Sequence, residues 1–125
     1  MKISTSLKKT KAVGLLVSLL LIALVSTVQA ATSTASLSYE SSKTGASIPI
    51  HDGSTTVHMS NESRSTAVLE SNVRKHIAIF PDPSVYFQPV QPGRGYSQPI
   101  GLSASNYYAQ ATSLNKIYAR VSFSD

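Results

Sequence analysis

Apolar and polar side chains alternate along several short stretches of the chain after residue 30. The alternation is clearest in residues 35–39, 55–60 and 117–123, where apolar side chains recur at every second position. A period of two places them on one face of a β-strand. Prolines leave no room for a helix of ordinary length in residues 81–99. We therefore predict seven or eight short strands, packed as an antiparallel sandwich or small barrel.

Turn sequences separate the predicted strands. Residues 51–54 contain the dipeptide Asp-Gly, and residues 91–95 contain Pro-Gly. Both dipeptides are typical of tight turns. We expect strands on either side of these turns, at residues 47–50, 55–60, 66–69, 73–80, 85–87 and 96–102.

A hairpin is predicted at the C-terminal end. Residues 106–114 and 117–123 have the pattern of two strands joined by the short loop Asn115-Lys116. We expect the core-facing side chains of the second arm to be Ile117, Ala119, Val121 and Phe123. A helix over residues 103–114 is the alternative, because apolar residues there also recur at intervals of three and four.

Residues 1–30 have the pattern of a secretory signal peptide. A basic head precedes the apolar run Val13–Val25, and the small residues Val28 and Ala30 follow it. A retained membrane anchor is the alternative, but a spanning helix needs about 20 apolar residues and this run is shorter. We expect cleavage after Ala30, export to the periplasm, cell surface or medium, and only transient membrane contact through the signal peptide.

Composition narrows the classes of function that remain. Of eleven Lys and Arg residues, four lie in residues 1–30, so residues 31–125 carry seven basic and six acidic side chains. A net charge of only +1 gives the exported part no general attraction to nucleic acid or anionic lipid. The chain has no cysteine, which excludes disulfides, thiol nucleophiles and cysteine-ligated zinc. We therefore predict a single small domain that does not bind nucleic acid.

The beginning of the exported part is interpreted as an arm. We divide the chain into a signal peptide (1–30), an N-terminal strand with a polar linker (31–45) and a folded body (46–125). Leu37 and Tyr39 are the only sizeable apolar side chains of the arm, and its polar end is rich in Ser and Thr. Such an arm can pair with its own sheet or add to the sheet edge of another chain. Leu37 and Tyr39 are therefore the candidate partner-binding residues.

Three segments carry a resemblance to a known family. Val57-His58-Met59-Ser60-Asn61-Glu62-Ser63 is similar to a strand of periplasmic immunoglobulin-like (Ig-like) domains. Residues 80–87 followed by Gln91-Pro92-Gly93 resemble their Pro-Gly segment, and residues 117–123 resemble a late strand bearing a tyrosine corner. Together they resemble the N-terminal domain of pilus chaperones and the end of fimbrial subunits. The resemblance implies one Ig-like antiparallel β-sandwich that binds a partner outside the cytoplasm.

The sequence contains few patterns that carry chemistry. Its histidines, His51, His58 and His76, lack the short spacing of metal ligands, and no Gly-x-Ser-x-Gly motif is present. The carboxylates show no spacing that favours a catalytic pair. The basic cluster Arg74-Lys75-His76 does not form one patch on a strand, because neighbouring side chains point to opposite faces. We predict no catalytic residue, no metal and no cofactor.

These observations favour a function based on binding. We predict an exported, non-catalytic Ig-like domain that acts by protein–protein contact or self-assembly in a fimbria- or pilus-related structure. The alternative is a small secreted antagonist of bacteriocin type, acting on an envelope target, and a secreted enzyme comes third. Asn61-Glu62-Ser63 also fits the acceptor pattern for N-glycosylation.

Overall fold

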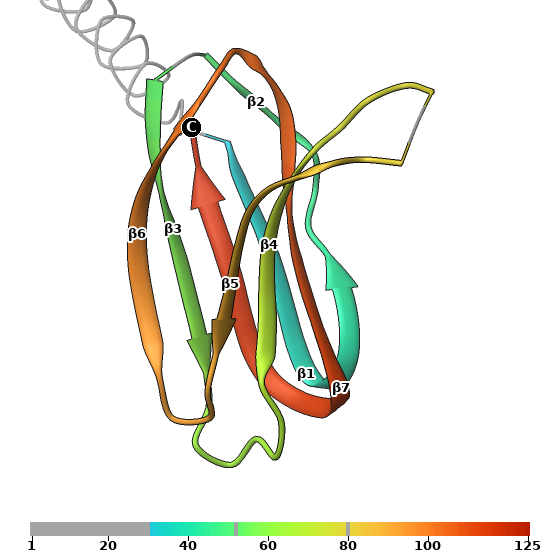
Figure 1. The fold of residues 1–125 in the computed structure, drawn as a ribbon, viewed down its shortest axis with the longest axis vertical. Helices are drawn as coiled ribbons and strands as arrows, with labels where there is room; N and C mark the ends of the chain where they lie inside the picture. The colour runs from blue at the N-terminus through green and yellow to red at the C-terminus, as the bar shows by residue number, and fades with distance from the viewer. Residues whose placement is uncertain (1–30, 52, 80) are drawn as a thin grey trace, which may run out of the picture. The chain divides into compact units, whose positions relative to one another are not determined.

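Seven β-strands and no helix make up the described part of the computed structural model, which comprises residues 31–51, 53–79 and 81–125 (Figure 1). They are β1 (Thr32–Thr44), β2 (Ile48–Ile50), β3 (Gly53–Asn61), β4 (Leu69–Lys75), β5 (Ser84–Val90), β6 (Gly95–Leu102) and β7 (Ser105–Ser124). The predicted all-β class is confirmed, and the alternative helix over residues 103–114 is wrong. The predicted signal peptide, residues 1–30, lies outside the described residues.

The strands form one antiparallel sheet centred on β7. Its order is β5-β4-β7-β3-β6, and both β1 and β2 pair with β7 as well. β7 reaches so many partners because it is 20 residues long and changes direction partway, as Figure 1 shows at the lower end of the molecule. The sheet therefore folds over itself into a near-barrel whose two layers face each other.

The bend in β7 replaces the predicted C-terminal hairpin. Residues 105–112 pair with β2, β4 and the end of β1, whereas residues 117–124 pair with β3 and the beginning of β1. The chain reverses near the predicted Asn115-Lys116 loop, but the two arms lie in opposite layers and do not pair with each other. Strands that switch layers at a bend are a usual way to form the corner of a folded sheet.

The core lies between the two layers and consists of alternate side chains from every strand except β5 and β6, which contribute one each. The four side chains predicted to face inward, Ile117, Ala119, Val121 and Phe123, are all buried. The rest of the core includes Leu37, Ile48, Ile50, Val57, Met59, Leu69, Val73, Val90, Leu102 and Tyr107. Leu114, which the hairpin would have placed opposite Ile117, is 95% exposed at the bend.

β1 closes one side of the fold by a very close backbone approach. Ser33, which is fully buried, accepts a hydrogen bond on Oγ from the backbone N–H of Ala109 at 2.9 Å. Gly45 packs against this point: a Cβ there would lie 2.6 Å from Ser33 Oγ and 2.8 Å from the backbone N and O of Thr34. The segment predicted to end in a polar linker is thus strand as far as Thr44 and then a tightly packed glycine.

Other predicted strands need smaller corrections. Residues 55–60 and 96–102 are strands as predicted, each within one or two residues of its bounds. The strand predicted at 73–80 ends instead at Lys75, and Ile79 is 84% exposed in the following loop. The strand predicted at 66–69 starts only at Leu69, as the beginning of β4. Val85 and Phe87 lie on β5 as expected but point to solvent.

Candidate functional site

Of the two candidate arm residues, Leu37 is buried and Tyr39 is exposed. Leu37 is 3% exposed and belongs to the core, so the folded domain does not present it to a partner. Tyr39 is 58% exposed and has a φ of 60°. The register of β1 against β7 shifts at this residue, between Ser38 and Glu40. Tyr39 is therefore a bulge residue in the left-handed region, a conformation that side chains larger than Gly or Asn seldom adopt.

The bulge places Tyr39 in a group of aromatic and cationic side chains, of which Tyr39, Arg64 and Lys116 are exposed and Tyr118 is half-buried. Its ring lies 5.7 Å from the ring of Tyr118, and the two planes are tilted by 34°. The guanidinium carbon of Arg64 lies 3.5 Å from the centre of the Tyr118 ring, and Lys116 Nζ lies 5.6 Å from the centre of the Tyr39 ring. These distances are typical of cation–π contacts. We call these four residues the tyrosine–cation cluster.

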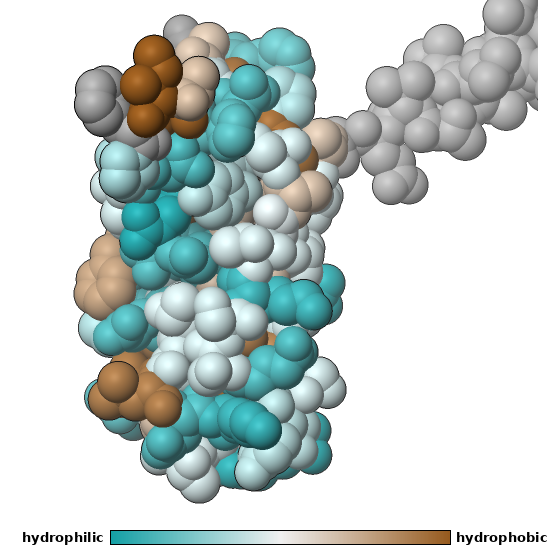
Figure 2. Space-filling model, turned by 90° about the vertical axis from the view of Figure 1, so that its right-hand side faces the viewer, coloured by the Kyte–Doolittle hydropathy of each residue, from teal (hydrophilic) through white to brown (hydrophobic). Residues whose placement is uncertain are grey.

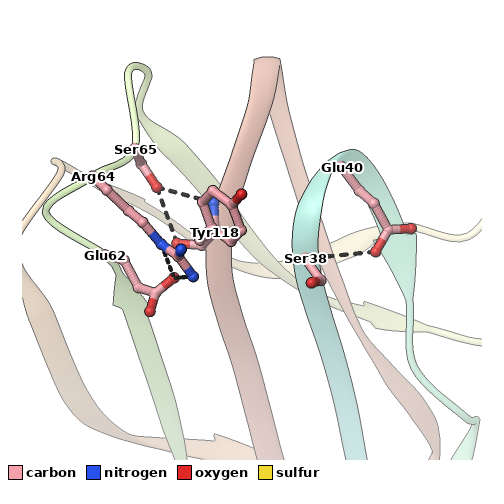
Figure 3. Close-up of polar contacts among 6 residues, drawn as sticks. All are labelled: Ser38, Glu40, Glu62, Arg64, Ser65 and Tyr118. Atoms are coloured by element: carbon pink, nitrogen blue, oxygen red, sulfur yellow. Dashed lines mark hydrogen bonds and ion pairs between the residues drawn. The ribbon is translucent and has the colours of Figure 1, made fainter.

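The loop that supplies Arg64 is fixed against β7 (Figure 3). Ser65 Oγ donates a hydrogen bond to the carbonyl of Tyr118 at 3.0 Å and accepts one from the Tyr118 N–H at 3.0 Å. The N–H of Glu62 donates to the same Tyr118 carbonyl at 2.9 Å. Glu62 Oε2 also accepts from Arg64 Nε and Nη2 at 3.3 and 3.2 Å. Backbone pairing and this ion pair thus hold the guanidinium over the ring.

Asn61, at the end of β3, holds the same loop through its buried side chain. Its side chain is 2% exposed, and Nδ2 donates to the carbonyls of Ala67 and Val90, both at 2.9 Å. The Gly93 N–H donates to the Asn61 carbonyl at 2.8 Å, so the Pro-Gly turn lies directly against this residue. Two of the segments that suggested a family resemblance are therefore in contact. The folded domain does not present the Asn61 amide to a glycosylating enzyme.

The β1 side of the cluster carries further charge. Figure 3 shows Glu40 folding back toward Ser38, where Oε1 accepts a hydrogen bond from the Ser38 N–H at 3.2 Å. Lys43 Nζ lies 3.6 Å from Glu40 Oε2, and both side chains are about half exposed. The corner therefore presents mixed charge around two tyrosine rings, and such exposed ion pairs add little to stability.

Chemically, this arrangement is suited to contact with another macromolecule. Tyrosine and arginine are the residues most enriched, with tryptophan, among those that dominate protein–protein binding energies. The rings are held by the fold and lose little entropy on binding. Figure 2 shows that the side of the domain in view is mainly hydrophilic, with hydrophobic residues in separate spots. Isolated exposed apolar residues of that kind are normal on soluble domains.

The three histidines have separate partners. His51 Nδ1 contacts Asp125 Oδ2, and its N–H donates to Asp125 Oδ1 at 3.2 Å. These hydrogen bonds from His51 lower the pKa of Asp125. His58 Nδ1 lies 2.8 Å from Ser97 Oγ. Within residues 31–51, 53–79 and 81–125, no three His, Asp or Glu side chains lie close enough to hold a metal ion.

Asp82 anchors the loop between β4 and β5. Its Oδ1 accepts a hydrogen bond from the Ile77 N–H at 2.9 Å, and its Oδ2 accepts one from the Tyr108 hydroxyl at 2.8 Å. These two bonds lower the pKa of Asp82, with smaller contributions from His76 and Arg74. Desolvation and the bond to Asp82 raise the pKa of Tyr108. These hydrogen bonds give Asp82 a structural role: it holds the β4–β5 loop by bonding the Ile77 N–H, just past the end of β4.

The sequence pointed to only one member of the cluster. Of the four, only Tyr39 is predicted as a binding residue; Tyr118 enters the sequence analysis through the tyrosine-corner resemblance, Lys116 through the predicted loop, and Arg64 not at all. Tyr118 alternates with the inward residues of β7 and could have been placed on the outer face from that pattern alone.

Comparison of the chain with protein-family models gives no match, and no curated protein or solved structure is significantly similar to it. The part of the chain that the structure describes contains no helix long and apolar enough to cross a membrane.

Proposed function

We propose that this chain is an exported, non-catalytic domain that works by contact with another protein, in an assembly at the cell surface or in the periplasm. The observation that supports this most directly is the tyrosine–cation cluster. It offers one exposed ring, Tyr39, beside the half-buried ring of Tyr118, together with the cations Arg64 and Lys116, at the cost of a left-handed backbone at Tyr39. Strained residues of this kind tend to persist where they serve a function.

The proposal includes an Ig-like sandwich and a fimbria- or pilus-related setting. Two facing layers around one core, joined by a strand that changes layer, are compatible with such a sandwich. The contact between Asn61 and the Pro-Gly turn also supports it, because the resemblance rests partly on those segments. Export rests on the signal-peptide pattern of residues 1–30.

Donation of β1 to a neighbouring chain does not fit the fold. β1 pairs with β7 of its own chain from Thr32 to Thr44, so it is not free to join a neighbour. β1 pairs with β7 alone, so its other side is also a sheet edge, and it contains no proline. The other edge strands β2, β5 and β6 each contain one proline within their ladder, at Pro49, Pro89 and Pro99. A proline has no N–H to donate to the paired strand. Its nitrogen and carbonyl therefore face away from that strand, toward the free edge.

The two outer edges are blocked further by glutamines. Gln88 Nε2 donates to the carbonyl of Pro89 at 2.9 Å, and Gln98 Nε2 donates to the carbonyl of Pro99 at 3.2 Å. Each edge therefore lacks one donor and has one acceptor already occupied. Such features protect sheet edges from pairing with another chain. This supports the cluster, rather than the β5 or β6 edge, as the surface through which a protein partner binds.

Site-specific photo-crosslinking in cells that express the full chain tests this function. A photo-reactive phenylalanine analogue replaces Tyr39 in one variant and Ile79, which is 84% exposed in the β4–β5 loop, in the control. We expect a discrete adduct with one protein, or with a second copy of this chain, from position 39 and none from position 79. Equal labelling from both positions, or no adduct from position 39, would contradict the proposal.

A further inference from the structure

A second feature of the outer surface lies on β3, β6 and β7. It is a hollow of about 310 Å³, lined among others by His58, Ser60, Tyr96, Ser97, Arg120 and Ser122. β3 is the middle strand, with β7 on one side and β6 on the other. The neighbouring side chains Val57 and Met59 point into the core, so the lining residues of β3 point outward.

Strand register explains why these side chains meet. His58 lies opposite Ser122 of β7 and Ser97 of β6. Ser60 lies opposite Arg120 of β7 and Gly95 of β6. Cross-strand partners lie side by side on one face, and because most of these are small, the surface is hollowed between the long side chains.

The chemistry of the hollow favours an anion. Arg120 has no carboxylate within 4.0 Å among the described residues, where four ion pairs involve other side chains. Two other hollows, of about 340 and 280 Å³, contain carboxylates: Glu70 in the first and Asp82 in the second. The hollow at Arg120 has no acidic residue in its lining. Of these three surface depressions, it is the one in which a negative charge meets only positive or neutral groups.

The remaining lining groups suit a ligand that is polar beyond its charge. His58 Nδ1 is paired with Ser97 Oγ at 2.8 Å, which fixes the ring and leaves the second nitrogen for a ligand. The hydroxyls of Ser60 and Ser122 can both donate and accept hydrogen bonds. Tyr96 is 46% exposed and offers a ring face at the edge of the hollow.

We propose that this hollow binds a carboxylate carried by a small polar ligand. The Arg120 guanidinium pairs with the carboxylate, because its planar fork matches the two oxygens. The Ser hydroxyls and His58 bond the neighbouring polar atoms, and Tyr96 packs against the ligand body. The same chemistry is offered by an acidic sugar and by the C-terminus of a short peptide. The site is distinct from the tyrosine–cation cluster, although Tyr118 and Arg120 lie on the same outer face of β7.

Titration monitored by amide chemical shifts tests the site on the full chain, kept soluble with a nonionic detergent. The probes are glucuronate and acetyl-Gly-Ala, with glucose and acetyl-alaninamide as their neutral counterparts and sulfate at matched ionic strength. We expect saturable shifts at Ser97, Arg120 and Ser122 with at least one carboxylate and none with the neutral probes. The stronger carboxylate identifies the source of the ligand group.

Two variants complete the test. Arg120→Gln should weaken carboxylate binding at least tenfold, whereas Lys75→Gln on β4, which removes the same charge elsewhere, should leave it unchanged. Equal weakening by both variants would show general charge attraction and overturn the site. Sulfate binding as strong as that of the carboxylates, or the absence of saturable shifts with either carboxylate, would overturn it as well.

Discussion

The two faces of β7 between residues 117 and 124 share one backbone and have different roles. On the inner face, Ile117, Val121 and Phe123 are at most 1% exposed and hold the two layers together. On the outer face, Tyr118 belongs to the tyrosine–cation cluster and Arg120 lines the hollow on β3, β6 and β7. Because the roles alternate along one strand, substitutions at neighbouring positions should separate folding from binding.

The largest effect is expected at Phe123. Truncating this buried ring in Phe123→Ala should lower the free energy of unfolding by about 3–5 kcal/mol, enough to unfold a small domain of ordinary stability. Ser122→Ala, on the outer face of the same strand, is the matched control and should change it by less than about 0.5 kcal/mol. Thermal or urea unfolding of both variants measures the difference. Equal shifts would show that the assignment of the two faces is wrong.

A smaller but clear loss of stability is expected at the closed side of the fold. In Gly45→Ala the new Cβ meets the Thr34 backbone at 2.8 Å, and the backbone has to move. Overpacking of this kind costs about 1–3 kcal/mol. Gly101→Ala on β6 is the control, because a Cβ there meets nothing within 4 Å. If the two alanines have the same effect on unfolding, β1 is not packed as closely against residue 45 as described.

The β4–β5 loop should respond to acid through Asp82. Hydrogen bonds from Ile77 and Tyr108 hold its pKa below the ordinary value of 3.8, so its contribution is present above that pH and is lost as pH falls through the lower folded-state pKa. Asp82→Asn should therefore be less stable than the wild type at neutral pH, and the difference should narrow in acid. Urea unfolding from pH 7 downward measures it. A difference that stays constant with pH would contradict this role.

The smallest effect on stability is expected on the outer face. Arg64 makes one exposed ion pair and one cation–π contact, each of which stabilises by no more than about 1 kcal/mol. Arg64→Gln should therefore lower the melting temperature only slightly, whereas the tyrosine-sensitive near-ultraviolet spectrum should change. A loss of stability comparable to that of Phe123→Ala would assign Arg64 to the fold and not to a binding surface.

The local pattern of apolar residues and turn dipeptides was sufficient to predict part of the fold. The period of two identified the inner face of residues 117–123, and the Asp-Gly and Pro-Gly signals separated strands at the right places. The predicted hairpin failed because a turn signal near Asn115 shows where a chain reverses but not which strand it then pairs with. That choice is made by residues 32–44, more than 60 positions away along the chain.

The errors elsewhere have similar causes. Ile77 and Ile79 alternate as in a strand, but Asp82 captures the Ile77 N–H and ends β4. In the cluster, Arg64 and Tyr118 are 54 positions apart, and the hydrogen bonds of Ser65 bring them together. Tyr39 joins them only through a bulge with a positive φ, which the alternation of β1 does not reveal.

The central claim is that the outer face binds a protein partner while the inner face serves only folding. We would place the photo-reactive residue at exposed Ser38, opposite Tyr118 in the register, and combine it with Tyr118→Ser and Arg64→Gln. The yield of the adduct should fall at least tenfold relative to the intact cluster, while the melting temperature changes by less than about 4 °C. An unchanged yield from the altered cluster would contradict the claim.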